Sequence, residues 1–103
     1  MPILVCHKAS YYSLLDEELF FHALKQISAV RKVEGVGSDL LITVHARPSH
    51  KSLRELLGLF YRYGVDMSQL AQFRTEQNES WFSSPTTYWA KKVFPKNRNE
   101  KLA

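Results

Sequence analysis

The alternation of hydrophobic and polar residues divides the chain into helices and strands. The strongest helical pattern lies in residues 49–73, where apolar residues recur at the spacing of one buried helix face: Leu53, Leu56, Leu57 and Phe60. Ser52 and Glu55 have the spacing of a capping box, and Ser49 is an alternative start. Gly64 stands where a left-handed residue would end the helix. The pattern predicts a core helix that ends at Gly64.

Three segments before this helix also show regular patterns. The short apolar run Pro2–His7 predicts a first strand. Leu14–Ile27 carries apolar side chains at helical spacing and three acidic residues in its first turn, where the helix dipole favours negative charge. Val30–Val36 and Asp39–Ala46 predict a β-hairpin, because apolar and polar residues alternate along the second arm. Either Gly37-Ser38 or Ser38-Asp39 can form the tight turn between the arms.

Residues 66–75 fit two interpretations. Asp66 followed by Met, Ser and Gln69 could cap a third helix, or it could form a turn that leads into a strand, Leu70–Thr75. The preceding order of strand, helix, strand, strand, helix favours the strand. A final strand would complete a ferredoxin-like βαββαβ plait, an antiparallel sheet with both helices on one face. We therefore expect an α+β fold of this type.

The C-terminal region predicts one more element and a tail. Residues 75–80 are polar and predict a loop. Ser84 and Pro85 are typical of a helix start, and apolar residues follow at helical spacing as far as Pro95, which predicts an additional C-terminal helix. Residues 96–103 lack apolar periodicity, and we expect them to form a basic, disordered tail.

Length and composition indicate one folded unit. The chain has 103 residues, of which 45% are hydrophobic and 23% charged, as in ordinary globular proteins, so we expect a single domain over residues 1–95. No apolar run approaches the ~20 residues of a membrane-spanning helix, and the first residues do not have the order of a signal peptide. The only cysteine, Cys6, cannot form an internal disulfide. These features predict a cytoplasmic protein without a membrane segment.

The positive charge is concentrated near the C-terminus. The formal net charge is +4, and it equals the excess of basic residues in residues 91–103, so residues 1–90 sum to zero. A neutral body with a basic tail favours a solvated tail over an arm that binds polyanions.

The sequence offers no constellation of catalytic or metal-binding residues. The four histidines, His7, His22, His45 and His50, lack the spacings of metal ligands, and no nucleophile elbow is present. Gly35 and Gly37 lie in the predicted hairpin rather than in a phosphate-binding loop. His7 and His45 would approach each other if the first and third strands were neighbours. A hydrolase that uses these two histidines therefore stays as a hypothesis, ranked third after the two functions discussed below. We expect no catalytic residue, no cofactor, no metal and no enzymatic activity.

RNA binding by a small βαββαβ domain requires aromatic side chains on the central strands, where bases can stack. Residues 2–7 and 39–46 contain no Phe, Tyr or Trp, and the body of the protein is neutral. Nucleic-acid binding through the basic C-terminal tail therefore remains only as an alternative.

Most of the aromatic residues lie elsewhere and permit two interpretations. The C-terminal segment could fold back so that its tryptophans cover the sheet or the second helix. Alternatively, aromatic and arginine side chains could form a protein-binding surface, because Tyr, Trp and Arg are the usual anchors of interfaces. The residues predicted for this surface are Tyr61, Arg62, Tyr63, Trp81 and Phe82. The sequence leaves open which aromatic residues are buried and how many copies assemble.

Four stretches together resemble a pattern in small stand-alone bacterial proteins: D-E-E-L-F-F-H-A-L, V-E-G-V-G-S-D-L-L-I-T-V, L-R-E-L-L-G-L-F-Y-R-Y-G-V-D-M-S-Q-L-A-Q-F and W-F-S-S-P-T-T-Y-W. The pattern, over Asp16–Phe94, is similar to that of single-domain immunity proteins encoded beside secreted toxins. The resemblance implies an inhibitor that binds and blocks a partner toxin. Immunity proteins against nucleases are commonly acidic, and the basic charge of this chain counts against a nuclease as its target.

The sequence therefore predicts a non-enzymatic protein-interaction module. The resemblance implies that this module is an immunity-type inhibitor. The expected partner is another protein, such as a toxin domain. No membrane is expected as a partner, and nucleic acid is disfavoured.

Overall fold

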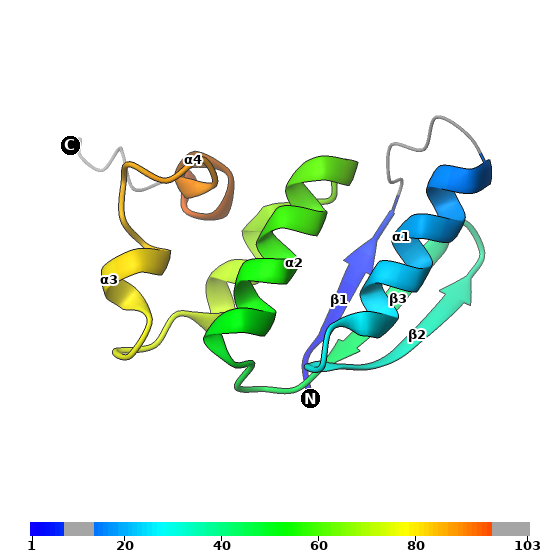
Figure 1. The fold of residues 1–103 in the computed structure, drawn as a ribbon, viewed down its shortest axis with the longest axis horizontal. Coiled ribbons are helices and arrows are strands. Elements are labelled where there is room, and N and C mark those ends of the chain that lie inside the picture. Colours follow the sequence, from blue (N-terminus) through cyan, green and yellow to red (C-terminus); the bar gives the residue numbers. More distant parts are fainter. Residues whose placement is uncertain (8–13, 96–103) are drawn as a thin grey trace.

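The computed structural model describes residues 1–7 and 14–95 of the chain (Figure 1). Its elements follow in the order β1 (Ile3–Cys6), α1 (Leu14–Gln26), β2 (Val30–Val36), β3 (Asp39–Val44), α2 (His50–Tyr63), the 3₁₀ helix η1 (Met67–Phe73), α3 (Glu79–Phe82) and α4 (Ala90–Val93). The α+β class predicted from the sequence is confirmed. The predicted tail of residues 96–103 lies outside the described residues.

The three strands form one antiparallel sheet in the order β1-β3-β2. Ile3 of β1 lies opposite Thr43 of β3, and Val36 of β2 lies opposite Asp39 across the hairpin. The hairpin turn is Gly37–Ser38, and Gly37 has a φ of 63°, a left-handed conformation that glycine adopts without steric cost. The predicted first strand and hairpin are therefore confirmed.

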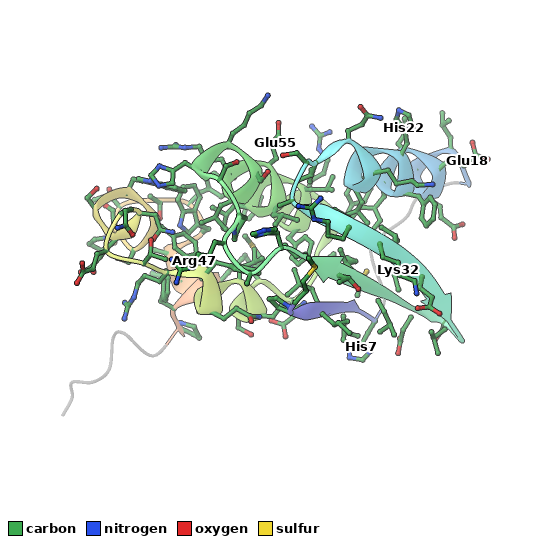
Figure 2. The ribbon with its side chains drawn as sticks, turned by 90° about the horizontal axis from the view of Figure 1, so that it is seen from below. His7, Glu18, His22, Lys32, Arg47 and Glu55 are labelled. Carbon is green, nitrogen blue, oxygen red and sulfur yellow. The ribbon has the colours of Figure 1, made fainter. Side chains whose placement is uncertain are left out.

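Helices α1 and α2 lie on the same side of the molecule (Figures 1 and 2). Helix α1 lies over the strands, and α2 lies beside β1 and over η1. Figure 2 shows Glu18, His22 and Glu55 on the helical side of the molecule, and His7 and Lys32 on the side of the strands. The core lies between the two layers and continues under η1, α3 and α4. Its largest fully buried side chains are Phe20, Phe60, Phe82, Leu4, Leu24, Ile42, Leu53, Leu56, Leu57 and Leu70.

Both ends of α2 have caps that the sequence indicates: a serine hydroxyl at the start and a left-handed glycine at the end. The Ser49 hydroxyl accepts a hydrogen bond from the main-chain N–H of Ser52 at 3.1 Å, which identifies Ser49 as the start. Ser52 is buried, and its hydroxyl lies 3.1 Å from that of Ser28. Gly64 has a φ of 70°, and its N–H donates to the carbonyl of Phe60, ending the helix as predicted.

The favoured strand over Leu70–Thr75 is wrong, because residues 67–73 form η1 instead. Met67, Leu70 and Phe73 recur every third residue and are all buried, which matches the three-residue turn of a 3₁₀ helix. Asp66 starts the helix, since its carboxylate accepts a hydrogen bond from the N–H of Ser68 at 3.0 Å. The helical alternative for this segment is therefore the one that forms.

The C-terminal region forms two short helices rather than the single predicted one. Helix α3 begins at Glu79, inside the predicted loop, and α4 begins only at Ala90. Between them, the Thr87 hydroxyl donates to the Ser84 carbonyl at 3.0 Å, and the Ser84 hydroxyl lies 3.0 Å from that of Thr86. These local bonds stabilise a turn at the place where the sequence predicts a continuous helix.

Candidate functional site

A chain of touching aromatic rings connects α2 to the segment that contains α3 and α4. The ring centroids of Tyr61 and Tyr88 lie 4.7 Å apart, those of Tyr88 and Trp89 lie 4.9 Å apart, and those of Trp89 and Trp81 lie 6.2 Å apart. All three contacts are edge-to-face, the geometry that the charge distribution of aromatic rings favours. On the α2 side, the Tyr88 hydroxyl lies close to Gly58, where an added Cβ atom would be 3.8 Å from it.

Trp89 joins this chain of rings to the core. It is buried, and its indole N–H donates to the carbonyl of Phe82 at 2.7 Å. This bond connects the turn before α4 to the end of α3. Phe82 is itself fully buried and packs its ring against Phe94 at 5.2 Å. Trp89 and Phe82 are thus part of the hydrophobic core.

Two cationic side chains lie over the rings at the two ends of this chain, Trp81 and Tyr61. The guanidinium of Arg54 lies 4.0 Å from the ring of Trp81, and the ammonium of Lys92 lies 6.0 Å from the ring of Tyr61. Such contacts attract the cation to the negative face of the ring. We call Arg54, Tyr61, Trp81, Tyr88 and Lys92 the aromatic–cation surface. Tyr61 is 49% exposed and Tyr88 is 54% exposed.

The five residues predicted for partner binding divide into three groups in the structure. Tyr61 and Trp81 belong to the aromatic–cation surface. Tyr63 and Phe82 are buried in the core, and the Tyr63 ring lies 4.8 Å from that of Phe20. Arg62 is exposed on the side of α2 that faces α1. The structure therefore does not bring the five residues together on one accessible surface.

Sequence reasoning missed Arg54, Tyr88 and Lys92 as members of this surface. Arg54 and Tyr61 are seven residues apart on α2, close to two helical turns, so a helical projection could have placed them on one side. Tyr88 and Lys92 also have helical spacing, but no local pattern could show that they pack against Tyr61. That contact depends on how the C-terminal segment folds back.

Burial raises the pKa of the Tyr88 phenol above its ordinary value, and the nearby Tyr61 phenol raises the pKa further. Both effects disfavour the negatively charged phenolate. The raised pKa therefore keeps the proton on the Tyr88 hydroxyl to a higher pH than on an ordinary tyrosine, and this hydroxyl can donate a hydrogen bond to an approaching acceptor.

A separate groove lies between α1 and α2. It is a groove of about 640 Å³, lined by Leu19, His22, Gln26, Glu55, Leu59 and Arg62 among others. Its side walls contain Leu19, which is 50% exposed, and charged residues of both signs from α2. This mixture of apolar and charged residues does not select a ligand of one charge.

The structure places His7 and His45 at opposite ends of the sheet. His7 follows β1 and its Nδ1 lies 3.1 Å from a carboxylate oxygen of Asp39, whereas His45 follows the other end of β3. The expectation that His7 and His45 approach each other is wrong, because the register pairs Ile3 with Thr43 and so sends the two histidines to opposite ends of the sheet. In the described part of the chain, no group of three or more His, Cys, Asp or Glu side chains could hold a metal ion.

No protein-family model, no curated protein and no solved structure matches the chain. Within residues 1–7 and 14–95, none of the helices is long and apolar enough to span a membrane.

Proposed function

We propose that this chain is a non-enzymatic protein-interaction module that binds an acidic segment of a partner protein through the aromatic–cation surface. The observation that carries the proposal is the pair of half-exposed tyrosines, Tyr61 and Tyr88, held edge-to-face at 4.7 Å. Lys92 lies over the ring of Tyr61, and Arg54 lies over the ring of Trp81 at the other end of the chain of rings. Tyr, Trp and Arg dominate the energetically important residues of protein interfaces.

The rings of this surface are held in place before any partner binds. Tyr88 contacts Tyr61 on one side and Trp89 on the other, and Trp89 is fixed by its hydrogen bond to Phe82. Ordering a side chain at an interface opposes binding by about 0.5–1.5 kcal/mol. Because these rings are already ordered, less of that cost remains when a partner docks.

The charges of the surface favour an acidic partner. Arg54 and Lys92 are the cations in contact with its rings, and Lys91 adds a further exposed positive charge on α4. Carboxylates of a partner can pair with these groups while its apolar side chains contact the tyrosine rings. Such pairing steers association more than it raises affinity, and it weakens with salt.

An inhibitor of immunity type is the specific form of this proposal. The sequence resemblance suggests it, and a rigid surface without catalytic residues would suit a protein that acts by blocking a toxin. The toxin would then present an acidic patch to the aromatic–cation surface.

We also infer that the fold is a variant of the ferredoxin-like plait. The strand order β1-β3-β2 corresponds to three of its four strands, and α1 and α2 lie on one side of the molecule, as both helices of the plait do. In this variant η1 takes the place of the fourth strand beside β1.

A site-specific photo-crosslinker identifies the partner. It is placed at position 88 and, as a matched control, at position 15 on α1, where Leu15 is 62% exposed. Crosslinking in the native host followed by mass spectrometry should yield one protein from position 88 and not from position 15. Nucleic acid captured at position 88 would instead support the alternative function, and equal capture at both positions would contradict the proposal.

The captured protein is then purified and its affinity measured. The double variant Tyr61→Ala/Tyr88→Ala should weaken binding at least about tenfold, as expected for interface anchors, while Leu15→Ala should not change it. If the partner is a toxin, the wild-type protein should inhibit it at one-to-one stoichiometry. Affinity that is unchanged in the double variant would rule out this surface.

A further inference from the structure

We propose that two copies of this chain associate through the outer edge of β2, which would extend the sheet across a two-fold axis. In the part of the chain that the structure describes, β2 pairs with β3 on one side only. Figure 1 shows β2 at the end of the molecule opposite to α3 and α4, so this association would leave the aromatic–cation surface of each copy accessible.

The hairpin determines which main-chain groups face the outer edge. Its two-residue turn joins Val36 to Asp39, and the residues that flank such a turn are hydrogen-bonded to each other. Hydrogen-bonded and non-hydrogen-bonded positions alternate along an antiparallel pair. The N–H and C=O groups of Val33 and Gly35 therefore point away from β3, towards the outer edge, where a second strand can bond to them.

The side chains of β2 favour one antiparallel register with a second copy. When Val33 lies opposite Val33 of the second copy, Lys32 falls opposite Glu34 and Glu34 opposite Lys32. Both pairs occupy non-hydrogen-bonded positions, where cross-strand side chains lie closest. Lys32 and Glu34 already lie on the same side of β2, with 3.4 Å between the ammonium nitrogen and a carboxylate oxygen.

Charged residues on an edge strand often prevent association because like charges meet in the pairing register. Here the order of charges about Val33 is self-complementary, so opposite charges meet in both halves of the pair. The strand is therefore suited to bind a second copy of itself. The β-bulge at Arg31 ends the regular pairing on that side.

Helix α1, which packs beside β2, repeats the same arrangement. Glu17, Phe21 and Lys25 are four residues apart and lie on one side of α1, where they line a hollow together with Gly35 of β2. Antiparallel packing about Phe21 would bring Glu17 opposite Lys25 of the second copy and the two Phe21 rings together. The helix and the strand thus favour the same two-fold symmetry independently.

Charge reversal on the strand tests this association directly. Sedimentation velocity of the wild-type chain from about 1 µM to about 1 mM should show a concentration-dependent dimer. Lys32→Glu and Glu34→Lys each place like charges opposite each other, and each should weaken the dimer about tenfold or more. The double variant Lys32→Glu/Glu34→Lys restores opposite charges, and it should return the dimer to near the wild-type affinity.

Two results would overturn the proposal: a wild-type chain that stays monomeric over the whole range, or a dimer that the single reversals leave unchanged. Far-UV circular dichroism checks that each variant is folded. As an independent measurement on the wild type, amide hydrogen exchange at Val33 and Gly35 should slow as protein concentration rises. Tyr61→Ala/Tyr88→Ala should leave the dimer intact, which separates this proposal from the partner surface.

Discussion

The side chain of Gln69 binds the main chain of Val5 in the way that a neighbouring strand would. Its amide oxygen accepts a hydrogen bond from the N–H of Val5 at 2.8 Å, and its amide nitrogen donates to the carbonyl of Val5 at 2.8 Å. The same nitrogen donates to the carbonyl of Asp66 at 2.9 Å, which fixes the side chain on η1. A single glutamine thus satisfies the outer edge of β1 at Val5 without a fourth strand.

Replacing Gln69 should destabilise the fold. In Gln69→Leu, both polar groups of Val5 lose their partner at a part-buried edge, and the free energy of unfolding should fall by about 1–3 kcal/mol. Gln69→Glu keeps the acceptor for the Val5 N–H but places a carboxylate oxygen against the Val5 carbonyl. Its free energy of unfolding should therefore fall at least as much as that of Gln69→Leu. Urea unfolding measures both values.

Gln77 is the matched control for Gln69. It is exposed, and Gln77→Leu should change the free energy of unfolding by less than about 0.5 kcal/mol. Equal stability of Gln69→Leu and Gln77→Leu would show that the pair with Val5 does not stabilise the native state.

The two tryptophans should respond differently to the same substitution. Trp89→Phe leaves the buried carbonyl of Phe82 without its hydrogen bond and should cost about 1–3 kcal/mol of unfolding free energy. The indole nitrogen of Trp81 is also buried, but it has no hydrogen-bond partner among the described residues, so Trp81→Phe should cost less. Thermal unfolding of the two variants side by side checks the order, and a less stable Trp81→Phe would contradict it.

Gly58 lies inside α2 and should accept alanine but not a larger residue. A Cβ atom at this position would lie 3.8 Å from the Tyr88 hydroxyl, an ordinary contact distance. Gly58→Ala should therefore raise the free energy of unfolding by about 0.5–1 kcal/mol, because glycine is a poor helix former. Gly58→Leu extends further towards Tyr88, and it should separate Tyr88 from Tyr61. Chemical denaturation compares stability, and the near-ultraviolet circular dichroism of the tyrosines reports the contact.

Tyr88 should make the protein less stable at alkaline pH. Because burial and Tyr61 raise the pKa of its phenol in the folded state above the unfolded value of about 10, the native state holds this proton more tightly. The resulting stabilisation is complete below about pH 10 and is lost as the pH rises through the folded-state pKa. Unfolding at a series of pH values above 9 should show a shallower loss in Tyr88→Phe than in the wild type. An identical pH dependence of the two proteins would exclude this role for Tyr88.

Much of the first half of the fold could be predicted from local patterns. The helix that begins at Ser49 and ends at Gly64 is encoded by apolar spacing, a capping hydroxyl and a left-handed glycine, all of which lie within sixteen residues. The hairpin is encoded equally locally, by alternation on either side of Gly37–Ser38. Each of these features works through residues that are neighbours in the chain.

The prediction failed where the sequence supported two local interpretations. Residues 67–73 contain apolar residues at a three-residue spacing, which favours a 3₁₀ helix, and a short β-compatible run from Leu70, which favours a strand. The general plan of the fold favoured the strand. The contact between Gln69 and Val5, 64 residues apart in the chain, allows the helix because it replaces the bonds that a strand would supply.

The sequence by itself determined the α+β class, the order of the first five elements, the caps of α2 and the abundance of aromatic residues near the C-terminus. The tertiary structure alone decided which of these aromatics are buried. Tyr88 and Trp89 are neighbours in the chain, yet Tyr88 is half exposed and Trp89 is buried, because the folded-back C-terminal segment brings the indole N–H of Trp89 to the carbonyl of Phe82. The side of α2 against which the C-terminal segment packs depends on contacts between distant residues. Local patterns do not contain that information.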